Sequence, residues 1–214
     1  MPILPATGDP PPEASLTAAV EALAAGAIVG IPTDTVYGLA ADPFRPGATR
    51  RLFEAKRRGR DVDLPVLVAS IEQAMSLTTA VPPIASILMH RFWPGPLTLV
   101  LPRRPDLAAD LGEDEATIGL RWPAHPVPVA LCEKGGPIAT TSANLHGQPT
   151  SETAEEVAAV FGDAVAVVLD GGRRAGSPST VVDCTGAEPR PLREGRIRWQ
   201  DVMAAYTHDD SGVG

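Results

Sequence analysis

Hydrophobic and polar positions follow two kinds of pattern along this chain. Short runs of Val, Ile, Leu and Ala are typical of buried strands, and they occur at 28–31, 65–69, 97–101, 117–121, 138–141, 165–170 and 180–184. Apolar residues three and four positions apart predict helices over 13–25, 49–57, 70–78, 82–92, 127–133 and 153–161. Because strands and helices alternate over most of the chain, we expect a single α/β domain with a twisted, open mixed sheet flanked by helices.

The two ends of the chain lack such periodicity. Residues 1–12 are rich in proline, so we predict a flexible segment there, a folded domain over 13–206 and a flexible tail over 207–214. The segment 191–197 is expected to add a last edge strand. No charged-then-apolar leader opens the chain and no apolar run approaches the length of a membrane span, so we expect a cytoplasmic protein without membrane contact.

Composition adds three points to this picture. With 214 residues, 44% hydrophobic but only 4% aromatic, the chain must build its core from aliphatic side chains. The net charge of -8 argues against non-specific binding of nucleic acid, yet six basic residues crowd into 50–60. A basic pocket on an acidic protein suits a small polyanion such as a nucleotide better than a long duplex. Cys132 and Cys184 show no metal-ligand spacing and are expected to be buried free thiols.

Polar side chains directly follow the first predicted strand. After Pro32, which has no N–H to continue a ladder, come Thr33, Asp34, Thr35 and Tyr37 within five positions. Such a cluster at the end of a strand can present a polar site at the edge of a sheet. It can equally be a strand-to-turn junction in which these side chains satisfy local backbone groups.

Other predicted strands also end in hydroxyl, amide or basic groups. Arg121 closes one strand, Thr141, Ser142 and Asn144 follow another, and Ser179 precedes a third. If these ends converge, they form one crevice of hydrogen-bond donors and cations, which suits a ligand carrying phosphate and carboxylate groups. Taken singly, a Ser-Ala-Asn sequence is more often a helix N-cap, and the basic residues after the second helix are more often a solvated helix end.

Familiar cofactor and catalytic motifs are missing from the sequence. There is no Gly-x-x-x-x-Gly-Lys-Ser/Thr loop for ATP and no Gly-x-Gly-x-x-Gly turn for a dinucleotide. The four histidines show no zinc spacing, and no Gly-x-Ser-x-Gly elbow supplies a hydrolase nucleophile. ATP could therefore not be held in the P-loop manner, and neither a dinucleotide site nor a hydrolase triad has support.

A series of short motifs, in one order, resembles the Sua5/YciO/YrdC family. The resemblance runs from about Ala25 to Ile197, nearly the whole chain. The motifs that carry it are Pro32-Thr-Asp-Thr-Val-Tyr-Gly-Leu39, Lys56-x-Arg58, Trp93-Pro-Gly-Pro-Leu-Thr98, Gly119-Leu-Arg121 with Pro123, Ser142-Ala-Asn144 with Gly147, Asp170-Gly-Gly172, Pro178-Ser-Thr-Val181 and Arg193-x-Gly195. One such motif would be weak evidence, whereas this many in sequence order are specific.

The resemblance implies an enzyme, an L-threonylcarbamoyladenylate synthase of the short, single-domain type. This nucleotidyltransferase joins L-threonine, bicarbonate and ATP into threonylcarbamoyl-AMP and releases pyrophosphate. A downstream transferase complex uses the product to make t6A at position 37 of tRNA. The family fold places a large, positively lined cavity in a twisted α/β sheet. Mg²⁺ would be bound through the ATP phosphates, so the resemblance implies no metal ligands from the protein.

The resemblance also implies roles for particular residues. Lys56 and Arg58 would be catalytic. The ATP-binding residues would be Lys56, Arg58, Thr117, Ser142, Asn144, Thr150 and Arg193. The threonine-binding residues would be Thr33, Thr35, Arg121, Thr140 and Ser179. Arg121 would pair bidentately with the threonine carboxylate, because a planar guanidinium can donate two parallel hydrogen bonds.

The sequence departs from the family pattern after Lys56-x-Arg58. The family usually has proline there, then Asn-Pro-Leu and a histidine, but here Gly59 replaces the proline and no histidine occurs before His90. Two alternatives stay open: a YciO-like paralogue that makes little or no threonylcarbamoyl-AMP, and an RNA-binding module that uses the arginines at 50–60. The net acidity and the few aromatics count against an RNA-binding module and leave room for weak binding of RNA or tRNA only.

Overall fold

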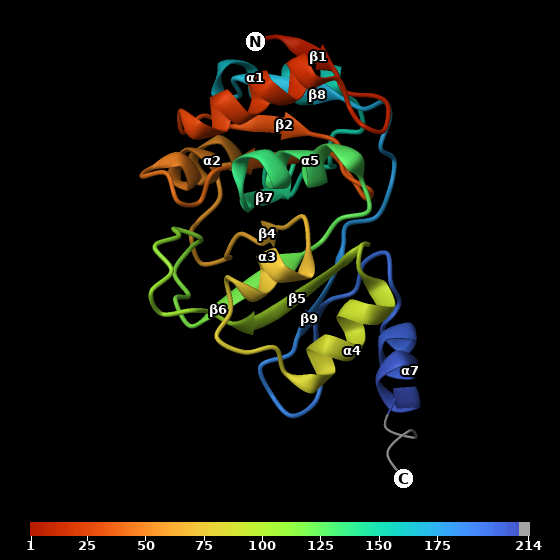
Figure 1. The fold of residues 1–214 in the computed structure, drawn as a ribbon. Helices are drawn as coiled ribbons and strands as arrows, with labels where there is room; N and C mark the ends of the chain where they lie inside the picture. The colour runs from red at the N-terminus through yellow and green to blue at the C-terminus, as the bar shows by residue number, and fades with distance from the viewer. Residues whose placement is uncertain (210–214) are drawn as a thin grey trace.

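The computed structural model describes residues 1–209 and contains one ten-stranded sheet that runs through the molecule (Figure 1). Its strands are β1 (Ile3–Pro5), β2 (Val29–Ile31), β3 (Gly38–Ala41), β4 (Val66–Leu67), β5 (Leu97–Pro102), β6 (Thr117–Arg121), β7 (Ile138–Ser142), β8 (Val167–Asp170), β9 (Thr180–Asp183) and β10 (Arg190–Arg193). They lie in the order β1-β8-β2-β3-β7-β4-β6-β5-β9-β10. The pairs β1–β8, β2–β8, β4–β6 and β5–β9 are parallel and the other five are antiparallel, which confirms the predicted mixed sheet.

Helices flank the sheet along its length. Within residues 1–209 they are α1 (Glu13–Ala24), α2 (Ala48–Lys56), α3 (Ile71–Met75), α4 (Pro83–Phe92), α5 (Pro126–Gly135), α6 (Ala154–Phe161) and α7 (Trp199–Asp209). Helices α1 and α5 pack together beside the half of the sheet that contains β1, β8 and β2, and α4 and α7 pack together at the opposite end (Figure 1). None of the helices in this described part of the chain is long and apolar enough to cross a membrane.

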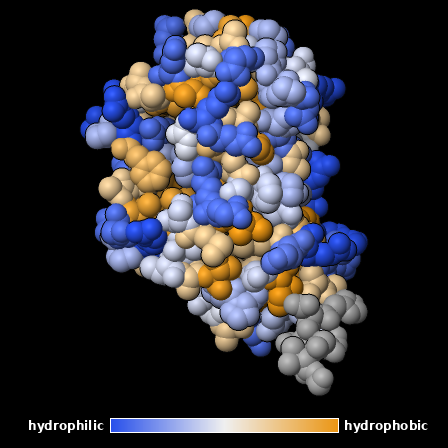
Figure 2. Space-filling view, in the orientation of Figure 1, coloured by the Kyte–Doolittle hydropathy of each residue, from blue (hydrophilic) through white to orange (hydrophobic). Residues whose placement is uncertain are grey.

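Two apolar clusters form the core, and both are mainly aliphatic, as the composition predicts. The smaller cluster includes Leu16, Val29 and Leu131 and joins α1 and α5 to the sheet. The larger includes Leu52 and Leu120 and extends beneath α2, α4 and α6. Exposed large apolar side chains are scattered over different elements, and on the face shown in Figure 2 hydrophobic residues occur in small groups between hydrophilic ones. Scattered exposure of this kind is normal for a folded domain.

Local sequence explains where several helices begin. The Ser70 hydroxyl accepts a hydrogen bond from the N–H of Gln73 at 3.1 Å, and the Thr153 hydroxyl accepts one from the N–H of Glu156 at 3.2 Å. These bonds satisfy N–H groups that have no partner inside the first turn of a helix. The predicted starts of α3 and α6 are therefore confirmed.

The N-terminal segment differs from its prediction. Proline-rich sequence predicts a flexible segment over 1–12, whereas Ile3–Pro5 form strand β1 beside β8. The Ser15 hydroxyl donates to the Pro5 carbonyl at 2.7 Å and ties this strand to α1. Backbone hydrogen bonds to β8, a segment far along the chain, hold this strand in place. Its own three residues are too few to show an alternation of apolar and polar positions, so the strand could not be predicted from them.

The C-terminal region differs as well. Strand β10 covers Arg190–Arg193 instead of 191–197, and α7 continues through the first three residues of the predicted 207–214 tail. The rest of that predicted tail, 210–214, lies outside the described residues. The Glu194 carboxylate accepts from the N–H of Trp199 at 2.7 Å and so caps α7. Trp199 and Tyr206 pack against the larger cluster.

Candidate active site

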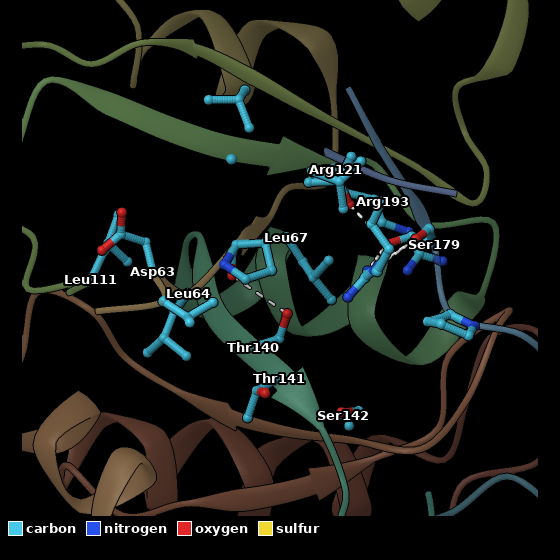
Figure 3. Close-up of a pocket in the computed structure, with 18 of the residues that line it drawn as sticks. Asp63, Leu64, Leu67, Leu111, Arg121, Thr140, Thr141, Ser142, Ser179 and Arg193 are labelled. Carbon is cyan, nitrogen blue, oxygen red and sulfur yellow. Dashed lines mark hydrogen bonds between the residues drawn. The ribbon is translucent and has the colours of Figure 1, made fainter. Parts of the chain in front are cut away.

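A cavity of about 500 Å³ lies between β7 on one side and β5, β6 and β9 on the other (Figure 3). Its wall is built from the turn between β2 and β3, the segment 58–65, these four strands, and residues near 178 and 193. Nine of the predicted site residues line it: Thr33, Thr35, Arg58, Thr117, Arg121, Thr140, Ser142, Ser179 and Arg193. Three others, Lys56, Asn144 and Thr150, are not part of the wall. The strand ends therefore converge as expected, whereas the role of each residue stays a prediction.

Arg121 ends β6, and its guanidinium is held from three sides. Nε donates to the Gly95 carbonyl at 3.0 Å, Nη1 to Thr35 Oγ1 at 3.2 Å and Nη2 to Asp34 Oδ1 at 2.5 Å. The side chain of Arg121 is 7% exposed and that of Asp34 is 12% exposed. A guanidinium has five N–H groups, so two remain for a ligand. Burial lowers the pKa of Arg121, and the charge of Asp34 opposes that effect.

Ser179 connects a second arginine to the cavity. Its Oγ lies 2.9 Å from Thr98 Oγ1 and accepts from Arg193 Nη2 at 3.1 Å. Arg193 also donates to the Ser179 carbonyl through Nε at 3.1 Å and Nη2 at 2.9 Å. Partial burial, followed by the charge of Arg58, lowers the pKa of Arg193. A hydroxyl beside a fixed guanidinium is a suitable partner for a carboxylate or a phosphate oxygen.

The two threonines of the β2–β3 turn act differently. Thr33 Oγ1 donates to the Val36 carbonyl at 2.6 Å and accepts from the N–H groups of Thr35 at 3.1 Å and Val36 at 3.2 Å. Its one hydroxyl proton is therefore used within the turn. Thr35 Oγ1 lies between Thr33 Oγ1, at 3.0 Å, and Arg121. The local-turn interpretation holds for Thr33, and the polar-site interpretation fits Thr35.

The two predicted catalytic residues at the end of α2, Lys56 and Arg58, point in different directions. Between them Arg57 has φ 52°, a left-handed conformation that ends the helix and places Arg58 on the cavity wall. Lys56 is 3% exposed, and its Nζ donates to the carbonyls of Ser142 at 2.6 Å and Asn144 at 2.8 Å and to Asn144 Oδ1 at 3.0 Å. Burial, followed by the charge of Arg58, lowers the pKa of Lys56 to about 8. All three N–H groups of Lys56 therefore hold the segment that follows β7.

Tyr37 fixes a further loop beside the cavity. Its hydroxyl donates to the Gly172 carbonyl at 3.0 Å and accepts from the N–H of Gly171 at 3.2 Å. The side chain is fully buried, and burial raises the pKa of Tyr37 to about 12. The sequence places Tyr37 among the polar residues after the first strand, and the structure shows that it holds the loop between β8 and Ser179.

Charge is unevenly distributed around the cavity. Arg58, Arg121 and Arg193 line it, as expected of a positively lined cavity, but Asp61, Asp63 and Asp114 line it as well. In Figure 3, Asp63 lies at one end of the cavity near Leu64 and Leu111, while Arg121, Arg193 and Ser179 lie at the other; Thr140, Thr141 and Ser142 follow one another along β7 on the lower side of the view. Burial, opposed by a hydrogen bond from the Asp114 N–H, raises the pKa of Asp63. The end with Arg121 and Arg193 is electrostatically suited to an anion.

Sequence reasoning missed several wall residues. Asp61, Asp63 and Asp114 sit in segments expected to be irregular or solvated, and Thr98 lies in a motif to which no role was assigned. The departure from the family pattern after Arg58 could have indicated Asp61 and Asp63, because the segment that departs forms part of the wall. Among residues 1–209, no three His, Cys, Asp or Glu side chains are grouped so that they could hold a metal ion. Binding of Mg²⁺ through ATP phosphates stays a prediction.

The mixed sheet and the polar cavity together define an α/β domain suited to binding a small charged molecule. Residues 21–195 match the Sua5/YciO/YrdC family, which carries the description "Telomere recombination". This chain belongs to the Sua5/YciO/YrdC family. The match covers most of the chain and confirms the resemblance drawn from the short motifs.

Relatives from several organisms support this assignment. A Mycobacterium tuberculosis protein is 45% identical over 201 residues, covering 92% of this chain and 92% of the relative. The Bacillus subtilis threonylcarbamoyl-AMP synthase is 41% identical over 191 residues, covering 87% of this chain and 55% of that enzyme. The chain therefore matches nearly the whole of one relative and about half of the other.

Solved structures share the fold. Pyrococcus abyssi Sua5 complexed with L-threonine superposes with a TM-score of 0.87 at 35% identity, covering 96% of this chain and 61% of that protein. Escherichia coli YciO superposes with a TM-score of 0.82 at 26% identity, covering 91% of this chain and 95% of YciO. The chain thus corresponds to about three fifths of the Pyrococcus protein and to nearly all of YciO.

Proposed function

We propose that this protein is a threonylcarbamoyl-AMP synthase that uses L-threonine, bicarbonate and ATP. The observation that carries the proposal is the arginine end of the cavity, where Arg121 keeps two N–H groups for a ligand beside Thr35 and close to Ser179 and Arg193. That arrangement suits an amino acid whose carboxylate binds a guanidinium and whose side chain hydroxyl meets another hydroxyl. The name of the Bacillus relative and the threonine complex of Pyrococcus Sua5 support the same activity.

The reaction needs positioning more than a covalent nucleophile. The threonine nitrogen bonds to the carbon of bicarbonate, water leaves, and a carbamate forms. A carbamate oxygen then bonds to the α-phosphorus of ATP, and the bond to the departing pyrophosphate breaks. Because the carbamate and the phosphates are both anionic, the site must offset their repulsion and hold them in line.

The residues divide between the two substrates. Arg121, Thr35 and Ser179 would hold threonine, with Thr33 and Thr140 completing that side. Arg58, Arg193 and Ser142 would face the ATP phosphates, and Thr117 would lie near the adenylate. Lys56 and Asn144 would act by shaping the segment after β7, since their polar groups bond to each other and to its backbone.

Mg²⁺ would enter with ATP and offset the charge of the departing pyrophosphate. Mg²⁺ is commonly held by substrate phosphates with only one or two carboxylates from the protein. Here Asp63 and Asp114 already accept hydrogen bonds from backbone N–H groups, so we assign no protein ligand to the ion.

Pyrophosphate release tests the proposal. Purified protein with Mg²⁺ and ATP should release pyrophosphate only when both L-threonine and bicarbonate are present, and labelled threonine should appear in an adenylate. Release that does not depend on threonine, or no release at all, would favour the YciO-like paralogue. We further propose that the product passes to a transferase complex that makes t6A in tRNA, which a coupled assay with that complex would test.

The RNA-binding alternative depends on the arginines at 50–60, and the structure disperses them. Arg51 donates to the Gly26 carbonyl at 2.5 Å, and Arg60 pairs with Asp110. Arg50 pairs with Glu54 at 3.6 Å, and Arg58 faces the cavity. Because these groups point to different partners, any RNA affinity should be weak and strongly reduced by salt.

A further inference from the structure

Asp34 is the carboxylate that contacts the guanidinium of Arg121, yet it is not part of the cavity wall. Its neighbours Thr33 and Thr35 both line the cavity, whereas the Asp34 carboxylate bonds to Nη2 of Arg121 from behind, at 2.5 Å. Both side chains are nearly buried, at 12% and 7% exposed. Removing one partner of a buried ion pair leaves the other charge uncompensated, which is far more costly than at the surface.

The surroundings of Arg121 make this counter-charge specific. Arg193 and Arg196 lie close enough for their charges to oppose the charged form of Arg121, and Asp34 favours it. Without the carboxylate, three guanidinium groups would lie near one another, two of them, Arg121 and Arg193, on the cavity wall and that of Arg196 behind it. Such a group of cations would repel one another and would attract any anion, including phosphate.

The turn that carries Asp34 is itself fixed. Arg196 Nη1 donates to the Asp34 carbonyl at 3.2 Å. The loop after β8 also packs directly on the turn, because a Cβ at Gly176 would lie only 2.4 Å from the Thr35 carbonyl. The carboxylate therefore stands at a fixed position and can hold the guanidinium in one orientation.

We infer that Asp34 is the positioning residue that directs Arg121 towards the substrate carboxylate and keeps this end of the cavity selective for a single carboxylate over phosphate. The inference rests on the proposed threonine-dependent activity. With Nε and one N–H of each Nη engaged by the protein, the two remaining N–H groups are left for the ligand. The Asp34 charge also offsets part of the positive charge that would otherwise draw phosphate into the threonine site.

The isosteric variant Asp34→Asn tests this role, with Asp42→Asn as the matched control. Asp42 follows β3 and accepts from the N–H of Phe44 at 2.9 Å, a local turn contact without a guanidinium. In Asp34→Asn, we expect the Kd of L-threonine, measured by calorimetry, to rise at least tenfold while the Kd of ATP changes less than threefold. The KM for threonine should rise in parallel, with kcat at saturating threonine nearly unchanged. Inorganic phosphate should become a stronger competitor of threonine in this variant, and Asp42→Asn should match the wild type.

Several outcomes would overturn the inference. They are an unchanged Kd for threonine in a folded Asp34→Asn variant, an equal weakening of threonine and ATP, or unchanged competition by phosphate. Circular dichroism and urea unfolding of the same preparation show whether the variant is folded. If the Asp34→Asn variant does not fold, the same changes in threonine, ATP and phosphate binding are expected of Asp34→Ser, whose hydroxyl can still accept from the guanidinium. A wild-type protein that binds no threonine would refute the proposed function itself, whereas normal binding in the wild type and in Asp34→Asn would refute only the role of Asp34.

Discussion

Replacing Lys56 by methionine tests how the segment after β7 is held. Methionine has a similar length and is uncharged, so Lys56→Met removes the ammonium while still filling most of its space. The change abolishes three hydrogen bonds, to the carbonyls of Ser142 and Asn144 and to Asn144 Oδ1. Of these acceptors, the Asn144 carbonyl would then lose its partner, whereas the Ser142 carbonyl still accepts from the N–H of Asn144 at 3.0 Å and Asn144 Oδ1 from the Ser142 hydroxyl at 2.5 Å. Water reaches this part of the protein poorly, since Lys56 is 3% exposed.

The size of the effect follows from these contacts. A hydrogen bond to a charged group contributes about 1.5–3 kcal/mol, and each buried acceptor left without a partner costs about 1–3 kcal/mol. Relaxation of the segment and entry of water would recover part of this, so we expect a loss of about 3–4 kcal/mol in the free energy of unfolding. If half of that loss also disfavours the ATP-bound arrangement of Ser142, turnover should fall by about ten- to thirtyfold at subsaturating ATP, since each 1.4 kcal/mol corresponds to about tenfold.

The assay compares Lys56→Met with Lys134→Met, the same change at the other lysine of the chain. The Lys134 side chain is 40% exposed and pairs with the exposed Glu13 at 2.9 Å, so its loss should cost less than about 1 kcal/mol. Urea unfolding gives the stability change, and amide exchange over 142–148 shows whether that segment has loosened. If Lys56→Met unfolds like Lys134→Met, exchanges normally over 142–148 and binds ATP as the wild type does, then the three bonds do not organise the segment.

Other perturbations test neighbouring parts of the site. Arg121→Lys should raise the KM for threonine at least tenfold but that for ATP less than threefold, because an ammonium cannot reproduce the planar fork; steady-state kinetics with both substrates checks this. Ser179→Ala should reduce the preference for threonine over 2-aminobutyrate by a factor equivalent to about 1–3 kcal/mol in kcat/KM. Tyr37→Phe should lower the free energy of unfolding by about 1–2 kcal/mol in urea titrations, since the N–H of Gly171 loses its acceptor. The pKa of Lys56 is lowered from 10.5 to about 8, so between these pH values the unfolded chain retains a proton that the folded protein has lost; the free energy of unfolding of the wild type relative to that of Lys56→Met should therefore rise from pH 8 to 10.5, because the two proteins share all other titrating groups.

The elements that the sequence predicts well are those with their own strong pattern. Strands β6 and β7 begin with β-branched and apolar residues and end in Arg121 and Ser142, so β6 could be predicted with its observed bounds and β7 to within one residue. Strand β3 could not be recognised, because Gly38–Ala41 contains no β-branched residue. It exists because it pairs with β2 on one side and with β7 on the other. That pairing is a property of the fold and leaves no local signal.

The site shows the same division. Hydroxyl and basic groups at strand ends could be predicted to converge, because strand ends in one sheet meet at common edges. The acidic end of the cavity, with Asp63 and Asp114, could not be predicted. The stretch 106–115 has the composition of a solvated loop, but the N–H of Leu64 donates to the Leu111 carbonyl at 2.8 Å and Arg60 pairs with Asp110. These contacts fold the loop against the segment 58–64 and bring Asp63 and Asp114 to the cavity.

The orientation of Lys56 was also beyond sequence reasoning. Lys56 and Arg58 are two positions apart in one motif, and both were expected to meet the phosphates. The left-handed conformation of Arg57 separates them, so that one lies behind the cavity wall and the other on it. The backbone conformation at Arg57 determines where the two side chains point, and the pattern of side chains in the motif does not predict that conformation.

Strand β1 has a practical consequence for how the protein is handled. It covers the outer edge of β8, and β8 ends at Asp170, whose carboxylate accepts from the N–H of Gly172 at 2.9 Å in the loop that leads to Ser179. Deleting Ile3–Pro5 would bare that edge, and unpaired strand edges promote aggregation. Fusion partners and affinity tags are therefore better attached beyond α7, which lies at the opposite end of the molecule from β1 (Figure 1).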